Sequence, residues 1–264
     1  MLLAIDVGNT NIVVGCVSEK GVAFSERIAT DSSKTELEYF VLFNELLKYH
    51  KIPLSKVEGA ALSSVVPPLT DTLVLAIKKL LGKEPLVVGP GVKTGLNIIT
   101  DNPAQVGADL IVNAVAGLRD YGAPLIMIDM GTATTISVVD NKKNYIGTVI
   151  MPGVRVSLNA LVSGTSQLPK ISLEAPKKVV GSNTIDCMKS GIIYAQAAAI
   201  DGMLDRIEDE MGYPIPAVAT GGLSPSIVPN CRREVTVDGD LTLRGLYYIF
   251  EKNREKKERS EAWI

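Results

Sequence analysis

Two short stretches of the chain place a carboxylate, a glycine and small polar residues directly after an apolar run. The first is Asp6-Val7-Gly8-Asn9-Thr10-Asn11, and the second is Asp129-Met130-Gly131-Thr132-Ala133. In such a turn, backbone N–H groups and hydroxyls can bind a phosphate, while the aspartate holds a cation or its water shell. Because the turn recurs with its strand context, we expect two similar domains whose turns face each other and grip the phosphates of a nucleotide.

A third glycine-rich stretch, Thr220-Gly221-Gly222, follows a short apolar run. Paired glycines allow close backbone approach, which suits an adenosine or ribose face. The stretch Gly89-Pro90-Gly91-Val92-Lys93-Thr94 resembles a Walker A loop but has valine where glycine must precede the lysine. No strand-linked GxGxxG occurs either, which argues against a dinucleotide site of the Rossmann type.

The composition argues against several other classes of function. The chain has 264 residues, is 46% hydrophobic and 21% charged, and carries a formal charge of −2. This charge argues against nucleic acid as a partner, and no apolar run approaches the ~20 residues that span a bilayer. Three distant cysteines predict no disulfide framework and favour the cytoplasm. The single histidine, His50, lies where a helical pattern ends, so we expect it to have a structural role at the helix C-terminus rather than a catalytic role.

The elements alternate in type, which predicts the α/β class. Strand-like runs are expected at 2–5, 11–17, 57–65, 86–88, 125–128, 134–139 and 217–219, and helical patterns at 35–48, 69–81, 104–118, 184–211 and 241–252. A charged turn and another short strand follow each Asp-x-Gly hairpin. With a boundary near Tyr121-Gly122-Ala123-Pro124, the sequence predicts an N-terminal domain at 1–121, a C-terminal domain at 122–252 and a charged tail at 253–264.

Further motifs occur in order along nearly the whole chain. They are Ser63-Ser64-Val65-Val66-Pro67, Lys93-Thr94-Gly95-Leu96, Asp101-Asn102-Pro103, Val106-Gly107-Ala108-Asp109, Pro152-Gly153, Leu168-Pro169, Gly181-Ser182-Asn183-Thr184 and Leu241-Thr242-Leu243-Arg244-Gly245-Leu246. With the two hairpins, this set resembles type III pantothenate kinases of the actin, Hsp70 and sugar-kinase superfamily. The resemblance implies two facing ribonuclease-H-like domains with mixed sheets, a homodimer, and ATP-dependent phosphorylation of pantothenate, the first step of coenzyme A synthesis.

The resemblance also implies a role for each matching residue. Asp109 would be the general base that takes the proton from the pantothenate hydroxyl. The residues themselves predict that it lies early in a helix opened by Asn102-Pro103, an N-cap-like pair. Asp6 would orient the waters of Mg²⁺ bound with ATP, and Asp129 would bind a monovalent cation, K⁺ or NH₄⁺. The remaining ATP contacts would be Val7, Gly8, Asn9, Thr10, Asn11, Thr132, Gly221 and Gly222, and the substrate contacts Thr100, Gly107, Ala108, Asp109, Leu110 and Thr184.

Four positions depart from the family pattern. Leu110 stands where the family usually has Arg, Thr100 where it has Tyr, Gln105 where it has Glu, and Ser137 where it has Asp. Leu110 and Thr100 fall where family members contact pantothenate, and each lost donor could have contributed about 1–3 kcal/mol. Two alternatives therefore stay open: a kinase of the same fold for another small alcohol, and a nucleotide-binding regulator without turnover.

Overall fold

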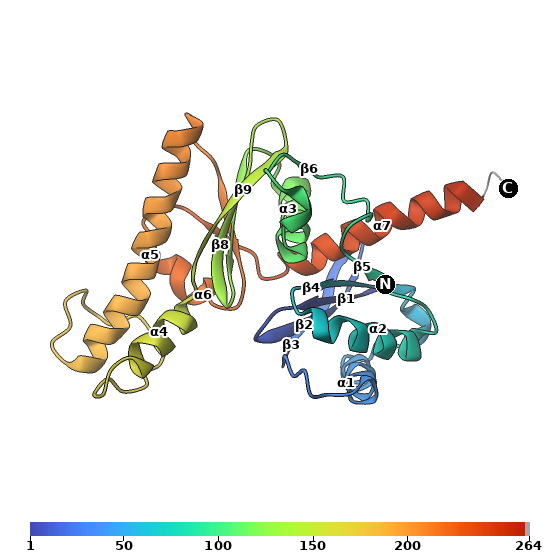
Figure 1. The fold of residues 1–264 in the computed structure, drawn as a ribbon, viewed down its shortest axis with the longest axis horizontal. Helices are drawn as coiled ribbons and strands as arrows, with labels where there is room; N and C mark the ends of the chain where they lie inside the picture. Colours follow the sequence, from blue (N-terminus) through green and yellow to red (C-terminus); the bar gives the residue numbers. More distant parts are fainter. Residues whose placement is uncertain (262–264) are drawn as a thin grey trace. The chain divides into compact units, whose positions relative to one another are not determined.

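The computed structural model describes residues 1–261 of the chain, with side chains through residue 254. Within this range the chain forms two compact units (Figure 1). Unit 1 contains residues 1–96, 101–120 and 240–261, and unit 2 contains residues 97–100 and 121–239. The chain therefore crosses between the units after residues 96, 100, 120 and 239.

Unit 1 is built on a five-stranded mixed sheet in the order β3-β2-β1-β4-β5. β1 pairs antiparallel with β2 and parallel with β4, and β5 extends the parallel part. The strands are β1 Leu2–Val7, β2 Asn11–Ser18, β3 Gly21–Ala29, β4 Gly59–Ser64 and β5 Leu86–Val87. Because β1 is central and buried on both faces, its apolar residues run without interruption to Asp6.

Helices cover both faces of this sheet. Leu3, Ile5 and Val7 belong to a cluster with residues of α1 (Glu36–Tyr49) and α2 (Pro67–Leu81), which Figure 1 shows on one side of the sheet. Leu2 and Ala4 point to the other face, where they pack with residues of α3 (Ala108–Asp120) and α7 (Leu241–Glu261). The alternation of β1 side chains thus produces a three-layer α/β/α unit.

Local signals fix where these helices begin and end. Thr35 and Glu38 form a reciprocal capping box at the start of α1, and Pro67 occupies the first turn of α2. Gly82 ends α2 in the left-handed conformation. His50 ends α1, where its Nε2 lies 3.0 Å from Oε1 of Glu26 and its ring stacks on Phe24. These contacts give His50 a structural role.

α7 belongs to unit 1, although the sequence predicted residues 240–252 in the second domain. Three glycines leave room for it: a Cβ at Gly15 would lie 2.6 Å from Leu243, and one at Gly59 would lie 2.8 Å from Phe250. A Cβ at Gly245 would overlap the carbonyl oxygen of Val112 in α3. Leu243, Leu246 and Ile249 of α7 complete the second face of the sheet, which is the physical reason for the correction.

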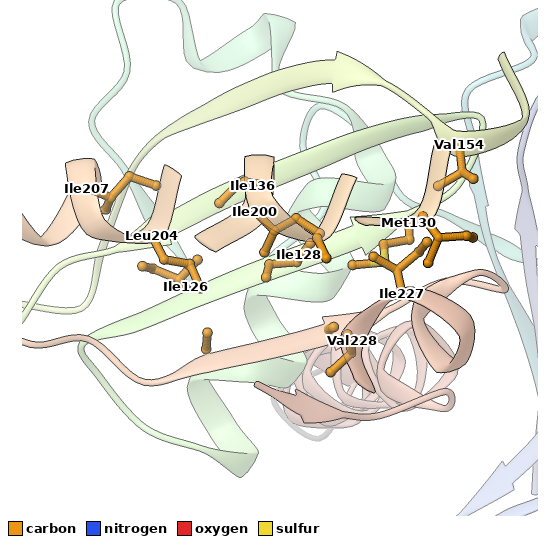
Figure 2. Close-up of a cluster of buried hydrophobic side chains, with 14 of the residues drawn as sticks. Ile126, Ile128, Met130, Ile136, Val154, Ile200, Leu204, Ile207, Ile227 and Val228 are labelled. Atoms are coloured by element: carbon orange, nitrogen blue, oxygen red, sulfur yellow. The ribbon is translucent and has the colours of Figure 1, made fainter. Parts of the chain in front are cut away.

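Unit 2 contains a six-stranded mixed sheet in the order β11-β10-β7-β8-β9-β6. The strands are β6 Asn97–Ile98, β7 Leu125–Met130, β8 Ala133–Val139, β9 Asn144–Pro152, β10 Ala217–Thr220 and β11 Thr236–Val237. Figure 2 shows its core, in which Ile126, Ile128 and Met130 of β7 pack against helices. The helices are α4 (Val154–Ser163), α5 (Thr184–Met211) and α6 (Ser224–Ile227).

The two units repeat one strand plan. Read from their hairpin ends, β3-β2-β1-β4-β5 corresponds to β9-β8-β7-β10-β11, with β6 added beside β9. In β1 and β7 only the fifth residue, Asp6 or Asp129, is not fully buried. Each meander also has a register shift at the matching place, between Cys16 and Val17 or between Val138 and Val139. The recurrence of the Asp-x-Gly turn in the sequence therefore reflects a structural repeat.

Other differences from the sequence expectations are local. The helix expected from 104 begins at Ala108, because Pro103–Gln105 forms a separate 3₁₀ turn. α4 and the short strands β6 and β11 were not predicted. Two further 3₁₀ turns span Leu54–Lys56 and Val228–Asn230. Among the described helices, none is long and apolar enough to cross a membrane.

Two helix glycines form a matched test of the α3–α7 contact. Gly245→Ala should destabilise the protein by about 1–3 kcal/mol, because the new methyl overlaps the α3 backbone. Gly191→Ala in α5 meets nothing within 4 Å and should stabilise by up to about 1 kcal/mol through helix propensity. Urea unfolding followed by circular dichroism measures both, and equal effects of the two substitutions would contradict the contact.

Candidate active site

The first hairpin holds its polar tip in one conformation. The N–H of Gly8 donates to the carbonyl oxygen of Asn11 at 3.0 Å. Thr30, just after β3, donates from Oγ1 to the Gly8 carbonyl at 2.6 Å and from its N–H to the Thr10 carbonyl at 3.0 Å. Asn9, Thr10 and Asn11 are exposed at this tip. The hairpin therefore presents amide and hydroxyl groups from a fixed backbone, as a phosphate site requires.

Asp6 is oriented by a residue of the neighbouring parallel strand. Ser63 lies opposite Asp6 in the β1–β4 register, and its Oγ donates to Oδ1 of Asp6 at 2.5 Å. Ser63 is completely buried, so its hydroxyl has no solvent alternative. Ser63 belongs to one of the motifs quoted above, but its contact with Asp6 was not predicted. The rule that the carboxyl ends of parallel strands meet at one sheet edge could have identified it.

The second hairpin has the same frame but a shorter loop. In hairpin 1 the paired residues Val7 and Ile12 enclose four residues, whereas in hairpin 2 Met130 and Thr134 enclose three. The N–H of Gly131 donates to the Ala133 carbonyl at 3.0 Å, and Thr132 is exposed at the tip. Thr134 is therefore the structural counterpart of Ile12. Aligning the two stretches on Asp6 and Asp129 without a gap would instead have paired Ile12 with Thr135.

Two glycines pack beside hairpin 2 within unit 2. Gly153, at the start of α4, lies so close that a Cβ would overlap the Thr132 carbonyl oxygen and approach that of Gly131 to 2.8 Å. Gly221 has φ +89°, and a Cβ there would lie 2.7 Å from the backbone of Met130. Since Thr220 pairs in register with Asp129, unit 2 brings Asp129, Thr132 and the Gly221-Gly222 turn together.

Asp109 lies in the first turn of α3, next to Gly107 and Leu110. Its Oδ1 accepts from the Leu110 N–H at 2.9 Å. Burial raises the pKa of Asp109 above that of an ordinary aspartate, although hydrogen bonds from the Leu110 and Asp109 backbone N–H groups oppose the shift. A Cβ at Gly107 would lie 2.5 Å from Oδ1 of Asp109 and 3.8 Å from Cγ of Leu110. The two side chains thus lie against the same glycine.

The predicted N-cap pair for this helix was wrong. Asn102 and Pro103 begin the separate 3₁₀ turn, and Asn102 makes no side-chain cap there. The chain then passes through Val106 in extended conformation before α3 begins at Ala108. Gln105 is exposed at the end of the 3₁₀ turn.

Two predicted substrate residues, Thr100 and Thr184, lie in unit 2. The Oγ1 of Thr100 is buried and has no hydrogen-bond partner within the described part of the chain. Thr184 is the first residue of α5, because Asn183 is the N-cap and accepts from the Asp186 N–H at 2.9 Å. Thr184 also lines a cavity of about 610 Å³ with Leu161, Cys187 and other residues of unit 2.

The remaining candidates have structural roles. Ser137 lies within β8 rather than at the hairpin tip, and its buried hydroxyl is 2.8 Å from Oγ1 of Thr148 and 3.2 Å from the Tyr145 hydroxyl.

Burial raises the pKa of the Cys16 thiol to about 12 and that of the Cys231 thiol to about 11. Over the described residues, no group of three or more His, Cys, Asp or Glu side chains could hold a metal ion.

A family model described as type III pantothenate kinase matches residues 2–206 of the chain. Solved structures share the fold at low identity. One is a protein designated a Baf family transcriptional activator from Campylobacter jejuni, with 18% identity, TM-score 0.55 and coverage of 96% of this chain and 99% of that one. Another is the activator of the 2-hydroxyisocaproyl-CoA dehydratase from Clostridium difficile, solved with bound ADPNP, with 13% identity, TM-score 0.58 and 97% coverage of both chains.

A third structure is a protein designated a 2-dehydro-3-deoxygalactonokinase from Sinorhizobium meliloti, with 12% identity, TM-score 0.56 and 96% coverage of both chains. At these identities the likeness concerns the fold alone. With the two mixed sheets, it confirms the predicted α/β class and the actin-type and sugar-kinase architecture.

Ser63→Ala tests the orientation of Asp6. If Asp6 orders the waters of Mg²⁺ as the resemblance implies, removing the buried hydroxyl should weaken the affinity for ATP with Mg²⁺ about tenfold, since outer-shell partners contribute on this scale. Ser25→Ala, at an exposed position of β3, is the matched control and should leave the affinity unchanged. Titration calorimetry at several Mg²⁺ concentrations measures the effect, and an unaltered affinity in Ser63→Ala would count against the role.

Proposed function

Because the chain belongs to the type III pantothenate kinase family, we propose that it transfers the γ-phosphoryl group of ATP to the hydroxyl of pantothenate. Membership makes the chain a nucleotide-binding kinase of coenzyme A biosynthesis that acts on a small molecule. The single observation that carries the specific reaction is the family match over residues 2–206. Pantothenate as the acceptor, and the role of each residue, are parts of the proposal.

The two hairpins would bind the phosphates of ATP. Hairpin 1 offers exposed Asn9, Thr10 and Asn11 on a backbone fixed by Thr30, and hairpin 2 offers Thr132. The Gly221-Gly222 turn would lie against the adenosine. Mg²⁺ would arrive with ATP, because this ion keeps water ligands and typically takes one or two carboxylates together with phosphate oxygens. Asp6, oriented by buried Ser63, suits the role of ordering those waters.

Asp109 would act as the general base. Phosphoryl transfer needs chiefly positioning and charge neutralisation, so one carboxylate near the attacking alcohol is sufficient. The carboxylate accepts the hydroxyl proton while the alcohol oxygen bonds to the γ-phosphorus and ADP leaves. Burial raises the pKa of Asp109, which makes it a stronger base than an exposed aspartate while it stays ionised at neutral pH.

A monovalent cation at Asp129 and a homodimer complete the proposal. Asp129 has the same position in the repeat as Asp6, at the end of a buried strand. Val179, Val180 and Ile185 are 66%, 85% and 49% exposed, and this apolar surface near Thr184 in the sequence supports self-association. Sedimentation at several protein concentrations tests the dimer, and potassium dependence of turnover tests the cation.

One observation favours a second candidate, a kinase for a less polar small alcohol. Leu110 lies beside Asp109 at Gly107, where the family usually has arginine. An apolar side chain there removes a charged donor from the acceptor pocket and favours a less polar acceptor.

An ADP-release assay distinguishes these functions. Wild-type protein should show pantothenate-dependent turnover, and Asp109→Asn should lower kcat by about 10²–10⁴-fold. Asp71→Asn, an exposed aspartate of α2, should keep the wild-type rate. Turnover only with other small alcohols would support the second candidate. Absence of turnover with any alcohol would leave a nucleotide-binding regulator, and a full rate in Asp109→Asn would refute the base.

The raised pKa of Asp109 predicts an effect of pH on stability. An ionised buried carboxylate destabilises the folded state at pH values above its native pKa, and this penalty vanishes below the unfolded pKa, where both states are protonated. Asp109→Asn should therefore melt at a higher temperature than wild type at pH 7. The difference should disappear as the pH falls to the ordinary aspartate range. Scanning calorimetry across this range measures it, and a variant that melts lower at pH 7 would contradict it.

Gly107→Ala tests the placement of the base. The added methyl would contact Oδ1 of Asp109 and turn the carboxylate away, so kcat should fall roughly 10–100-fold with little change in melting temperature. Gly89→Ala, whose Cβ meets nothing within 4 Å, is the matched control. A normal kcat in Gly107→Ala would show that the carboxylate position tolerates the shift.

A further inference from the structure

A cavity of unit 1 lies away from the proposed catalytic residues. It measures about 400 Å³ and is lined by Thr94, Gly95, Leu96, Val115, Leu118, Arg119, Tyr248, Glu251 and Lys252. We call it the α3–α7 pocket. Arg119 is ten residues after Asp109, so the two residues are separated by about 15 Å along the axis of α3. The proposed reaction gives this pocket no role.

The walls of the pocket are held in place by hydrogen bonds between side chains and backbone of α3, α7 and the segment at residue 93. Asn253 holds the backbone of Lys93, the residue before Thr94, with two hydrogen bonds. Its Oδ1 accepts from the Lys93 N–H at 3.2 Å, and its Nδ2 donates to the Lys93 carbonyl at 3.0 Å. On the opposite wall, Asp120 accepts from Arg244 and from the Tyr248 hydroxyl, both at 2.8 Å. The segment that resembles a Walker A loop thus serves as a fixed wall of this pocket.

The charges around the pocket are unbalanced. The guanidinium of Arg119 lies 3.9 Å from the centre of the Tyr248 ring, and within the described residues neither Arg119 nor Lys252 forms an ion pair. The acidic side chains nearby are engaged: Glu251 accepts from Arg254 at 2.6 Å, and Asp120 is bound by Arg244. Arg254 is shared between Glu251 and Glu58, so Arg119 and Lys252 are the two lining cations that no described acidic side chain pairs with.

The rest of the lining is apolar. Leu96, Val115 and Leu118 are half-buried, and the Tyr248 ring, over which Arg119 lies, is also part of the lining. Two uncompensated cations favour a dianion, and arginine binds phosphate oxygens with paired N–H groups. An apolar wall rewards a ligand that also buries hydrocarbon. From these features we propose that the α3–α7 pocket binds a small phosphate monoester that carries an apolar or aromatic body.

The position of the pocket in the chain gives such binding a consequence. Thr94 to Leu96 directly precede the crossing into unit 2 after residue 96, and Arg119 precedes the crossing after residue 120. A ligand that bridges these two segments and α7 would restrain the ends of both. The site is thus suited to a regulatory ligand of the kinase.

Phenyl phosphate is the probe, measured by titration calorimetry on protein saturated with a non-hydrolysable ATP analogue and Mg²⁺. The full-length wild-type chain should bind it at least about tenfold more tightly than inorganic phosphate, because only phenyl phosphate uses the apolar wall. Benzoate, with one negative charge, should bind several-fold more weakly than phenyl phosphate. The double variant Arg119→Ala/Lys252→Ala should lose at least about tenfold in affinity for phenyl phosphate.

Arg27→Ala/Lys142→Ala is the matched control, since both side chains are exposed cations outside the pocket. It should bind phenyl phosphate as wild type does, and circular dichroism checks that both double variants are folded. Equal affinity in Arg119→Ala/Lys252→Ala and wild type would overturn the site. Binding of inorganic phosphate or benzoate as tight as that of phenyl phosphate would overturn the ligand class. Calorimetry reads binding directly, so this result is separate from the outcome of the pantothenate assay.

Discussion

The structure depends on one arrangement that occurs twice, a buried strand paired antiparallel with its successor and parallel with a later strand. In β1 and β7 both faces are covered, so a charged side chain fits only near the end of the strand. That end carries Asp6 in one unit and Asp129 in the other. The parallel partner then delivers a hydroxyl residue opposite each, Ser63 or Thr220. The same pairing that builds each core also places polar groups at one edge of its sheet.

The repeat keeps this frame and varies the loops. Hairpin 1 has the longer tip, tied to β3 by Thr30. Hairpin 2 is one residue shorter and is packed closely by Gly153 and Gly221. A side chain at either glycine would overlap the hairpin backbone or the end of β7. The two tips therefore differ in both loop length and packing, although the strands that carry them follow one plan.

Asp109 shows the cost of a buried carboxylate. Its carboxylate is removed from water, which raises its pKa, and hydrogen bonds from the Leu110 and Asp109 backbone N–H groups offset part of the loss of hydration. Gly107 leaves the space into which this carboxylate points. Leu110 shares that space and gives the site an apolar neighbour. The raised pKa of this carboxylate and its cost to the stability of the fold are therefore set within one turn of α3.

The sequence by itself determined the α/β class, the two Asp-x-Gly hairpins, most of the strands and the main helices, because apolar periodicity and turn residues act locally. It did not determine that α7 belongs to unit 1, since that depends on the close approach of α7 to β2, β4 and α3 that Gly15, Gly59 and Gly245 allow. It also missed the start of α3 at Ala108 and the bond from Ser63 to Asp6. Those features were decided only by tertiary structure, because strand register and helix docking bring together residues that no local pattern connects.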